Sequence, residues 1–366
     1  MHDQRANTSV IENALDYVID VTGCADHPDA ALSVSAWIGA MRTMLEPSER
    51  LHVIGDGGIS LAGLSDVSTQ TASFAQRSAF LAEVRADLVH RFSSGERYCR
   101  GIPNLFTPID ISDIAKSSGR LFGFSFVKTH RCRRNLRRAA HIFVPSIASF
   151  ETLSAFVGAN SLSRCSVLSP PAPKVFVPGF DEAISDLRSR HDLPERFFLA
   201  VDRGGEGNNL ETLLEAYDML DETASLPLIV AGRESQRVRI PQKVRYVEIE
   251  SAAELAGLIS ASSVFLYPEH GGDFPYPLLW AMACGAPTIA AATHQVREIA
   301  SGEVKLVHPT DRVEWRRALT SAVVSMEWRD PAKQAGLKKA AEFNAETSAR
   351  RTLEIYRKIT RKTGVS

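Results

Sequence analysis

A short glycine-rich loop is the first feature of this sequence that could do chemistry. Gly204, Gly205 and Gly207 follow the apolar run Phe197–Val201 and precede a helix expected at Asn209–Leu220. Glycine lets the backbone come close to a ligand, and the free N–H groups at the start of a helix favour an anion. The order of strand, glycine loop and helix predicts a ligand site, since ligands of open α/β sheets lie at the carboxyl ends of the strands.

A second group of polar side chains forms a basic run between Lys128 and Arg138. If this stretch is helical, it forms a strongly basic surface, and a solvated helix face is the simpler interpretation. The residues concerned are Lys128, His130, Arg131, Arg133, Arg134, Arg137 and Arg138.

The composition limits the class of protein that can carry these groups. The chain has 366 residues, of which 44% are hydrophobic and 23% are charged, and its formal net charge is −1. This length predicts two domains, and the near-neutral charge gives no field that would favour nucleic acid. No apolar run is long enough to span a bilayer, and the first residues lack the pattern of a secretory signal.

The five cysteines are scattered along the chain and are odd in number. No two of them have the CxxC spacing of a zinc site, and their pattern argues against a disulfide framework. We therefore expect no metal site and a reducing, cytoplasmic environment. The residues are Cys24, Cys99, Cys132, Cys165 and Cys284.

The first half of the chain alternates short apolar runs with helical stretches. The expected strands are 17–22, 51–54, 105–111 and 141–145, and the expected helices are 32–45, 74–88 and 133–140. Pro108 is a weak point in the third strand, because proline removes a hydrogen bond from the ladder. The alternation predicts βαβ units and a parallel sheet.

A proline-rich stretch, Ser169–Pro178, separates this half from the next. Its four prolines exclude a regular helix or a central strand. We interpret it as the interdomain linker, with domains at 1–175 and 176–344 and a basic C-terminal helix within 345–366.

After the linker the alternation restarts with a clearer pattern. The expected strands are 197–201, 226–231, 244–249, 264–267 and 288–292, and the expected helices are 209–220, 252–260 and 277–284. This order predicts a second doubly wound α/β domain.

Two segments of this half carry longer motifs. The first, residues 197–217, reads FFLAVDRGGEGNNLETLLEAY. The second runs from Leu255 to Glu298 and contains LAGLISASSVFLYP and GGDFPYPLLWAMACGAPTIAA. Together they resemble two motifs of family 4 of the retaining glycosyltransferases. The first segment resembles the family's strand, Gly-Arg loop and Lys-Asn helix. The second resembles its Glu-Gly-Phe-Gly and Glu-Ala-Met-Ala-Cys-Gly-Pro signature. The residues in register in the second segment are Pro268, Phe274, Pro277, Ala281, Met282, Ala283, Cys284, Gly285 and Pro287.

The resemblance covers roughly residues 197–310 and implies the GT-B fold. This fold is α/β, with two Rossmann-like doubly wound domains that face a central cleft, the first on the acceptor side and the second binding the nucleotide sugar. It also implies that the C-terminal helix returns to the N-terminal domain.

A nucleotide-sugar site in the second domain follows from the same resemblance. The family binds the diphosphate with a helix N-terminus and an Arg/Lys pair. Arg203 stands in the arginine position and Asn208 in the lysine position. A solvated loop arginine, and a helix cap formed by Asn208 with Glu211, are the simpler alternatives. The residues expected to bind the donor are Arg203, Gly204, Gly205, Asn208, Phe274, Pro275 and Tyr276.

The two glutamates with which the family contacts sugar and ribose are missing. By register they fall at Gly272 and Trp280, and an indole cannot accept a hydrogen bond from ribose. Asp273 and Glu269 lie close to the first position, and Asp273 is the catalytic candidate; its alternative role is to cap the helix that begins near Pro277. Trp280 could stack on a base or a sugar, and packing in the core is the favoured interpretation.

The first domain departs from the family as well. Asp87–His90 resembles the family's Asp-apolar-apolar-His strand, while the family's His-Asp pair corresponds to Ile109 and Asp110. Since the histidine of that pair contacts the sugar, the resemblance leaves His90 and Asp110 as catalytic candidates, with His27 as another substitute. A lone histidine is, however, more often packed or on the surface.

The resemblance implies an enzyme of polysaccharide biosynthesis that moves a sugar, with retention, from a UDP- or GDP-linked donor to a glycan, lipid or protein acceptor. Such enzymes stabilise the leaving diphosphate electrostatically and need no metal or other cofactor. Basic runs such as 128–138 can meet anionic lipid or polyprenyl-phosphate acceptors, which makes this run a candidate for peripheral contact with the inner membrane face.

A different class is a catalytically inactive homologue that acts as a scaffold, a regulatory subunit or a glycan-binding partner. Losing one preorganised stabilising group typically costs ~100-fold in rate, and here the usual lysine, histidine and both glutamates are replaced. A nucleotide-sugar epimerase of the same fold fits the order of the motifs poorly. An acidic group that faces Arg203 would favour chemistry, whereas a cleft filled by Trp280 and Tyr276 would favour the scaffold.

Overall fold

The computed structural model describes residues 14–55, 73–95, 97–109, 111–117, 124–221, 225–233, 240–300, 302–325 and 327–363. The chain divides into two compact units. Unit 1 comprises the chain up to Pro171 and again from Asn344, and unit 2 comprises Ala172–Phe343. These divisions lie beside the limits expected at 175 and 344.

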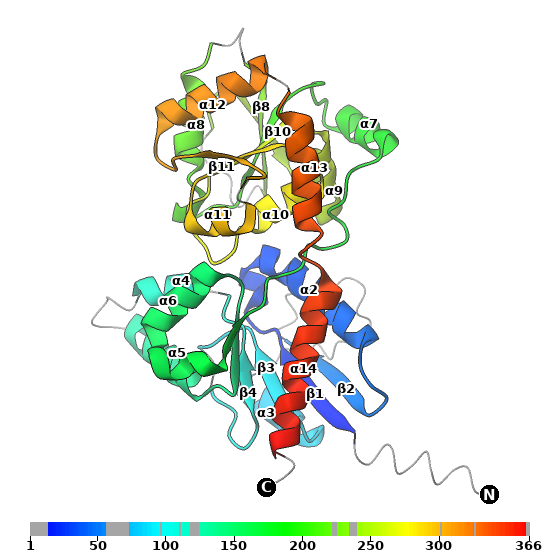
Figure 1. The fold of residues 1–366 in the computed structure, drawn as a ribbon, viewed down its shortest axis with the longest axis vertical. Coiled ribbons are helices and arrows are strands. Elements are labelled where there is room, and N and C mark those ends of the chain that lie inside the picture. Colours follow the sequence, from blue (N-terminus) through cyan, green and yellow to red (C-terminus); the bar gives the residue numbers. More distant parts are fainter. Residues whose placement is uncertain are drawn as a thin grey trace, which may run out of the picture. The chain divides into compact units, whose positions relative to one another are not determined.

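Unit 1 is built around a six-stranded parallel sheet with the strand order β2-β1-β3-β4-β5-β6. The chain passes from β1 to β2 and then reverses to β3, so β1 and β3 form a topological switch point. The strands are β1 (Leu15–Asp20), β2 (Glu49–Ile54), β3 (Leu88–Arg91), β4 (Asn104–Phe106), β5 (His141–Val144) and β6 (Cys165–Val167). The α-helices are α2 (Pro28–Thr43), α3 (Phe74–Glu83), α4 (Ile111–Ser117), α5 (Phe124–Arg138), α6 (Ile147–Val157) and α14 (Ala345–Thr363) (Figure 1).

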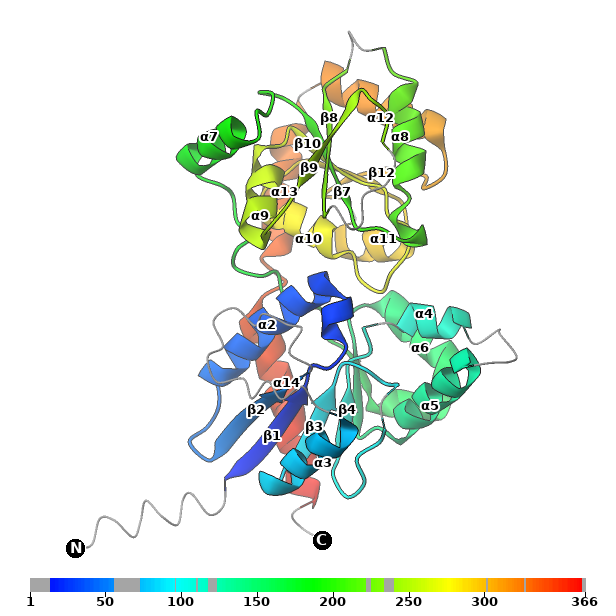
Figure 2. The same cartoon turned by 180° about the vertical axis from the view of Figure 1, so that it is seen from behind.

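Unit 2 repeats this plan with the strand order β12-β11-β10-β7-β8-β9, again all parallel. Here the chain reverses between β7 and β10, which are neighbours. The strands are β7 (Phe198–Asp202), β8 (Leu228–Gly232), β9 (Val244–Glu248), β10 (Val264–Tyr267), β11 (Thr288–Ala291) and β12 (Lys305–Val307). The α-helices are α7 (Asp181–Arg190), α8 (Leu210–Asp218), α9 (Ala252–Ala261), α10 (Tyr276–Ala283), α11 (His294–Ala300), α12 (Arg312–Val324) and α13 (Arg329–Ala340) (Figure 2).

The last helix, α14, belongs to unit 1, where it packs beside α2 (Figures 1 and 2). Its buried apolar side chains recur at helical spacing, and the Trp37 indole donates to Thr352 Oγ1 at 3.2 Å. The Arg357 guanidinium donates two hydrogen bonds of 2.7 Å to the buried Glu49 carboxylate. Burial opposes ionisation of Glu49, but these bonds win and lower the pKa of its carboxyl.

Two expected elements of unit 1 end earlier than the sequence pattern suggested. The strand expected at 105–111 stops at Phe106, two residues before Pro108, and α4 begins at Ile111. The helix expected at 74–88 stops at Glu83, because Arg85 adopts a left-handed conformation with φ of 51° and the chain then turns into β3.

A buried cluster of charges lies at the carboxyl ends of β1 and β3. One Asp20 carboxylate oxygen is 3.6 Å from Arg77 Nε and 3.5 Å from Arg91 Nε, and all three side chains are almost completely buried. Arg91 also donates to the Arg97 carbonyl oxygen and to the Cys99 sulfur. The Asp20 carboxylate thus faces two buried guanidinium groups.

All five cysteines are free thiols, and all but the half-buried Cys165 are buried. Burial raises the pKa of Cys165 and of Cys284 to about 12. Within the described residues, no helix is both long and apolar enough to cross a membrane.

Candidate functional site

The glycine loop of unit 2 lies at the carboxyl end of β7, beside the switch point with β10. Gly204 and Gly205 have φ values of 68° and 80°, a region that other residues rarely adopt. The buried Asp202 closes the loop, because its Oδ1 accepts from the Gly204 N–H at 3.0 Å and from the Asn208 amide at 2.9 Å. Asp202 was not among the residues predicted from the sequence, although its place before a glycine loop is a usable signal.

Arg203 is held at this edge by an acidic partner, Glu269, from the loop that follows β10. Its Nη1 lies 2.9 Å from Glu269 Oε2, and the Tyr267 hydroxyl donates to the same oxygen at 3.1 Å. The Glu269 side chain is 8% exposed, whereas that of Arg203 is 30% exposed. A ligand at the carboxyl ends of β7 and β10 can therefore reach the guanidinium, which carries five N–H donors in a planar fork.

Asn208, the residue in the expected lysine position, is buried within the loop. Its amide bonds Asp202, and its Oδ1 accepts from the Arg203 backbone N–H at 3.4 Å. The expected helix cap by Asn208 is not observed, because α8 begins one residue later and its N-cap position is Asn209, with φ of 50°. The Asn209 amide instead donates to the carbonyl oxygens of Pro268 and Pro309, both at 2.9 Å.

The loop after β10 is pressed against the glycine loop. A side chain at Gly207 would stand 3.2 Å from the Cα atom of Gly271, and the His270 N–H donates to the Gly207 carbonyl oxygen at 3.1 Å. Gly272, at the position of the family's first glutamate, has φ of 87°. This conformation strains any residue with a Cβ atom, so a glutamate does not fit this backbone without strain.

Asp273, Phe274 and Pro275 are buried just before α10, and Tyr276 is half-buried. The N-cap position of α10 is Pro275, which has no side-chain cap hydrogen bond. The Phe274 and Tyr276 rings are 5.0 Å apart in an edge-on arrangement. Of these four side chains, that of Tyr276 is the most exposed to solvent.

Trp280 lies in the core of unit 2, as favoured from the sequence. It is 1% exposed and stacks on Phe176 at 4.4 Å with an angle of 4° between the rings. The indole therefore occupies the ribose-glutamate position as a packing group. From the sequence, an acidic group facing Arg203 would favour catalysis over a scaffold role. Glu269 is such a group.

His90 is fully buried in unit 1, with each ring nitrogen close to a hydroxyl group. Nδ1 lies 2.6 Å from the Tyr356 hydroxyl, and Nε2 lies 2.7 Å from Thr107 Oγ1. Burial, and to a smaller degree His141, lowers its pKa to about 3. This geometry favours the packing role over contact with a sugar. Asp110 lies outside the described residues, and His27 is half-buried at the start of α2.

A cavity of about 810 Å³ lies along α8 and is bordered by Gly205 and Asn208 of the glycine loop. Its walls carry Glu211, Glu215 and Asp218, of which Glu215 lies 2.7 Å from Arg312 Nε and Asp218 lies 3.1 Å from Lys243 Nζ.

The two parallel six-stranded sheets with flanking helices define the GT-B fold, which confirms the expectation from the sequence. Sucrose-phosphate synthase from Thermosynechococcus elongatus superposes with a TM-score of 0.72 and 18% sequence identity, over 94% of this chain and 99% of that chain. HepE from Anabaena, solved in complex with UDP and glucose, superposes with a TM-score of 0.73 and 14% identity, over 92% and 98%.

The match to a family model lies within the second unit. Residues 183–339 match the model of the family described as glycosyl transferases group 1. The chain is 25% identical over 161 residues to the O-antigen chain mannosyltransferase B of Escherichia coli, which covers 41% of this chain and 42% of that protein. It is 34% identical over 119 residues to a D-inositol 3-phosphate glycosyltransferase of Nocardioides sp., which covers 31% and 26%. These matches thus span less than half of the length of either relative.

Proposed function

We propose that this chain is a cytoplasmic glycosyltransferase of group 1 type, which transfers a sugar from a nucleotide-diphosphate donor to a glycan, lipid or protein acceptor with retention of configuration. The observation that carries the proposal is Arg203, held by Glu269 at the β7/β10 switch point beside the glycine loop. The match to group 1 transferases and the solved neighbour with bound UDP support a nucleotide donor.

In this proposal the donor diphosphate lies against the glycine loop and the start of α8. Gly204 and Gly205 let the backbone approach the phosphates, and the helix N-terminus favours their charge. Arg203 then donates to the leaving diphosphate as the glycosidic bond breaks, and this preorganised charge stabilises the transition state without a metal. Glu269 fixes the direction of the guanidinium.

Asn208 stands where the family has a lysine, and this limits how much positive charge the site offers to the diphosphate. An amide that is committed to the loop cannot supply the positive charge of the family's lysine, so the diphosphate has one cation less. Asp273, buried directly after the strained Gly272, is the residue that we assign to the sugar. The same two features favour the second candidate function, an inactive homologue that binds a nucleotide or a partner without turnover.

Isothermal titration with UDP, GDP and their sugar conjugates tests the donor site. We expect one nucleotide to bind and an Arg203→Ala variant to bind it roughly 10- to 100-fold more weakly, because a charged hydrogen bond contributes about 1.5–3 kcal/mol. Arg190→Ala is the matched control, since Arg190 lies exposed on α7 in the same unit.

A donor-hydrolysis assay then separates the two candidate functions. Release of nucleotide that Arg203→Ala slows by ~100-fold supports the transferase. Tight binding without release supports the inactive homologue, and no binding of any nucleotide refutes the donor site altogether.

A further inference from the structure

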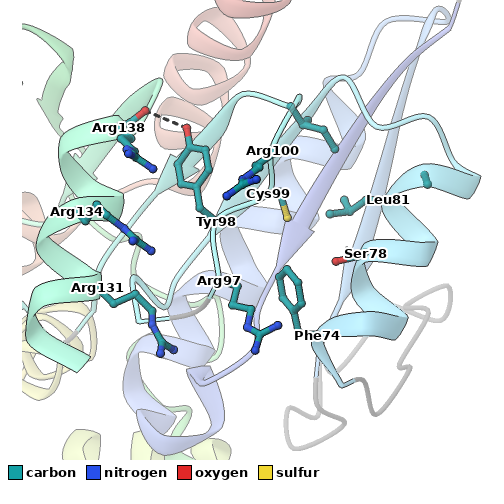
Figure 3. A pocket seen from close by; sticks show the side chains of 12 residues that line it. Phe74, Ser78, Leu81, Arg97, Tyr98, Cys99, Arg100, Arg131, Arg134 and Arg138 are labelled. Carbon is teal, nitrogen blue, oxygen red and sulfur yellow. Dashed lines mark hydrogen bonds between the residues drawn. The ribbon is translucent and has the colours of Figure 1, made fainter. Parts of the chain in front are cut away.

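A pocket in unit 1 lies between α3 and α5 and has a volume of about 640 Å³ (Figure 3). The connection from β3 to β4 has no helix in its described part, so α3 and α5 flank a stretch of sheet that no crossover helix covers. We call this space the arginine pocket, defined by Arg97, Arg100, Arg131, Arg134 and Arg138.

The five guanidinium groups of the arginine pocket come from two elements. Arg97 and Arg100 belong to the β3–β4 connection, and the other three lie at helical spacing along one face of α5. None of the described residues that line the pocket is acidic. Within the part of the chain that the structure describes, none of the five forms an ion pair with a carboxylate.

The basic run at 128–138 is therefore not one uniform surface. Arg133 lies over the Phe156 ring at 4.7 Å, and Arg137 Nε donates to the Val157 carbonyl oxygen at 2.8 Å. These two side chains pack against α6, while Arg134 and its neighbours one turn away face the pocket. The division concentrates charge in a concave site instead of spreading it over a helix face.

The remaining wall of the arginine pocket is apolar and aromatic. It is formed by Phe74, Leu81 and Ile102. Tyr98 lies between Arg100 and the arginines of α5 (Figure 3). The Tyr98 hydroxyl donates to the Arg138 carbonyl oxygen at 3.0 Å, which fixes the ring. Arg97 lies over the Phe74 ring at 5.5 Å, so its guanidinium is held at the apolar edge.

This arrangement has the chemistry of a phosphate site. Guanidinium forks bind phosphate oxygens in pairs, and uncompensated like charges gain most from a ligand with several negative charges. The volume exceeds that of a single phosphate group, and the apolar wall suits a ring or a chain attached to it. We propose that the arginine pocket binds a phosphomonoester or diphosphate that carries an apolar or ring-shaped group. This inference concerns unit 1 and goes beyond the proposed transfer reaction.

Titration with inorganic pyrophosphate, and flotation with phosphatidylcholine vesicles with and without phosphatidic acid, test the proposal and its two sources of phosphate. The test variant is Arg134→Gln combined with Arg138→Gln, since both side chains are exposed and glutamine keeps the helix. Arg350→Gln with Arg351→Gln removes the same charge from exposed positions of α14 in the same unit. Circular dichroism confirms that both variants are folded.

We expect the wild type to bind pyrophosphate, or the phosphatidic acid vesicles, and the pocket variant to bind about 100-fold more weakly, roughly tenfold for each guanidinium removed. The α14 variant should bind as the wild type does. Pyrophosphate binding that persists in Arg203→Ala and is lost when the pocket substitutions are added belongs to the arginine pocket and not to the donor site. Pyrophosphate binding alone identifies a soluble phosphate ligand, and vesicle binding alone identifies a lipid headgroup. Binding of neither probe, or equal binding by the pocket variant, overturns the proposal.

Discussion

Lowering the pH from 7 to 5 should destabilise unit 1 through its buried histidines. His90 has no exposure to solvent, and burial together with His141 lowers its pKa to about 3. An unfolded histidine has a pKa of about 6.5, so the unfolded chain takes up the proton first. The stabilising contribution is complete above pH 6.5 and is lost progressively as the pH falls towards 3.

The size of the effect follows from this difference in proton binding. At pH 5 an unfolded histidine with a pKa of about 6.5 gains about 2 kcal/mol from protonation that a neutral buried histidine does not gain. His141, whose pKa burial and then Lys358 and Arg164 lower to about 4, adds a similar amount. Between pH 7 and pH 5 the free energy of unfolding should therefore fall by about 4 kcal/mol in the wild type, through both histidines. In His90→Gln it should fall by about 2 kcal/mol.

Urea denaturation at pH 7 and pH 5 measures this loss. Trp37 is the only tryptophan in unit 1, and its ring lies 5.4 Å from that of His90, so the transition that disappears from the fluorescence of a Trp37→Phe variant belongs to this unit. Glutamine keeps hydrogen-bonding capacity but has no charge at either pH. His130→Gln is the control, because His130 lies exposed on α5. If His90→Gln shows the same pH dependence as the wild type, the reasoning is refuted.

Two further substitutions test the buried charges and the strained loop. Asp20→Asn removes the buried carboxylate charge that faces Arg77 and Arg91 and should lower the free energy of unfolding of unit 1 by about 3–5 kcal/mol in urea denaturation; a loss below ~1 kcal/mol would contradict the cluster's role. Gly272→Glu restores the family's residue type at φ of 87° and should cost about 1–2 kcal/mol in unit 2 without raising donor hydrolysis; faster hydrolysis would show that the loop accepts the carboxylate.

The strands and helices that the sequence predicted in unit 2 lie close to observed elements because local signals define them, whereas α7, α11, α12, α13 and β12 were not predicted. The strand expected at 264–267 is observed at those residues, and the helix expected at 277–284 is shifted by one residue. In unit 1 the boundaries at Glu83 and Phe106 depend on the backbone conformation of Arg85 and on Pro108, which apolar periodicity does not report. Boundaries set by single backbone angles are therefore the part of the fold that periodicity misses.

The candidate site was predictable in its location but not in its contacts. The glycine loop after an apolar run located Arg203, whereas its partner Glu269 is 66 positions away and has no local signal. The buried roles of His90 and Trp280 depend on neighbours from distant segments, Tyr356 and Phe176, which are brought together only by packing. A motif fixes the position of a side chain in the chain, and the fold decides whether it meets solvent.

Because the thiols are buried, their rate of labelling measures how often each unit opens. Cys284 is the only cysteine of unit 2, and its raised pKa of about 12 leaves almost no thiolate at neutral pH while the unit is folded. A thiol reagent can then modify Cys284 rapidly only in molecules whose unit 2 has opened, so the labelling rate counts opening events. The native chain thus reports the opening of unit 2 without an introduced probe, and the buried Cys24, Cys99 and Cys132 do the same for unit 1.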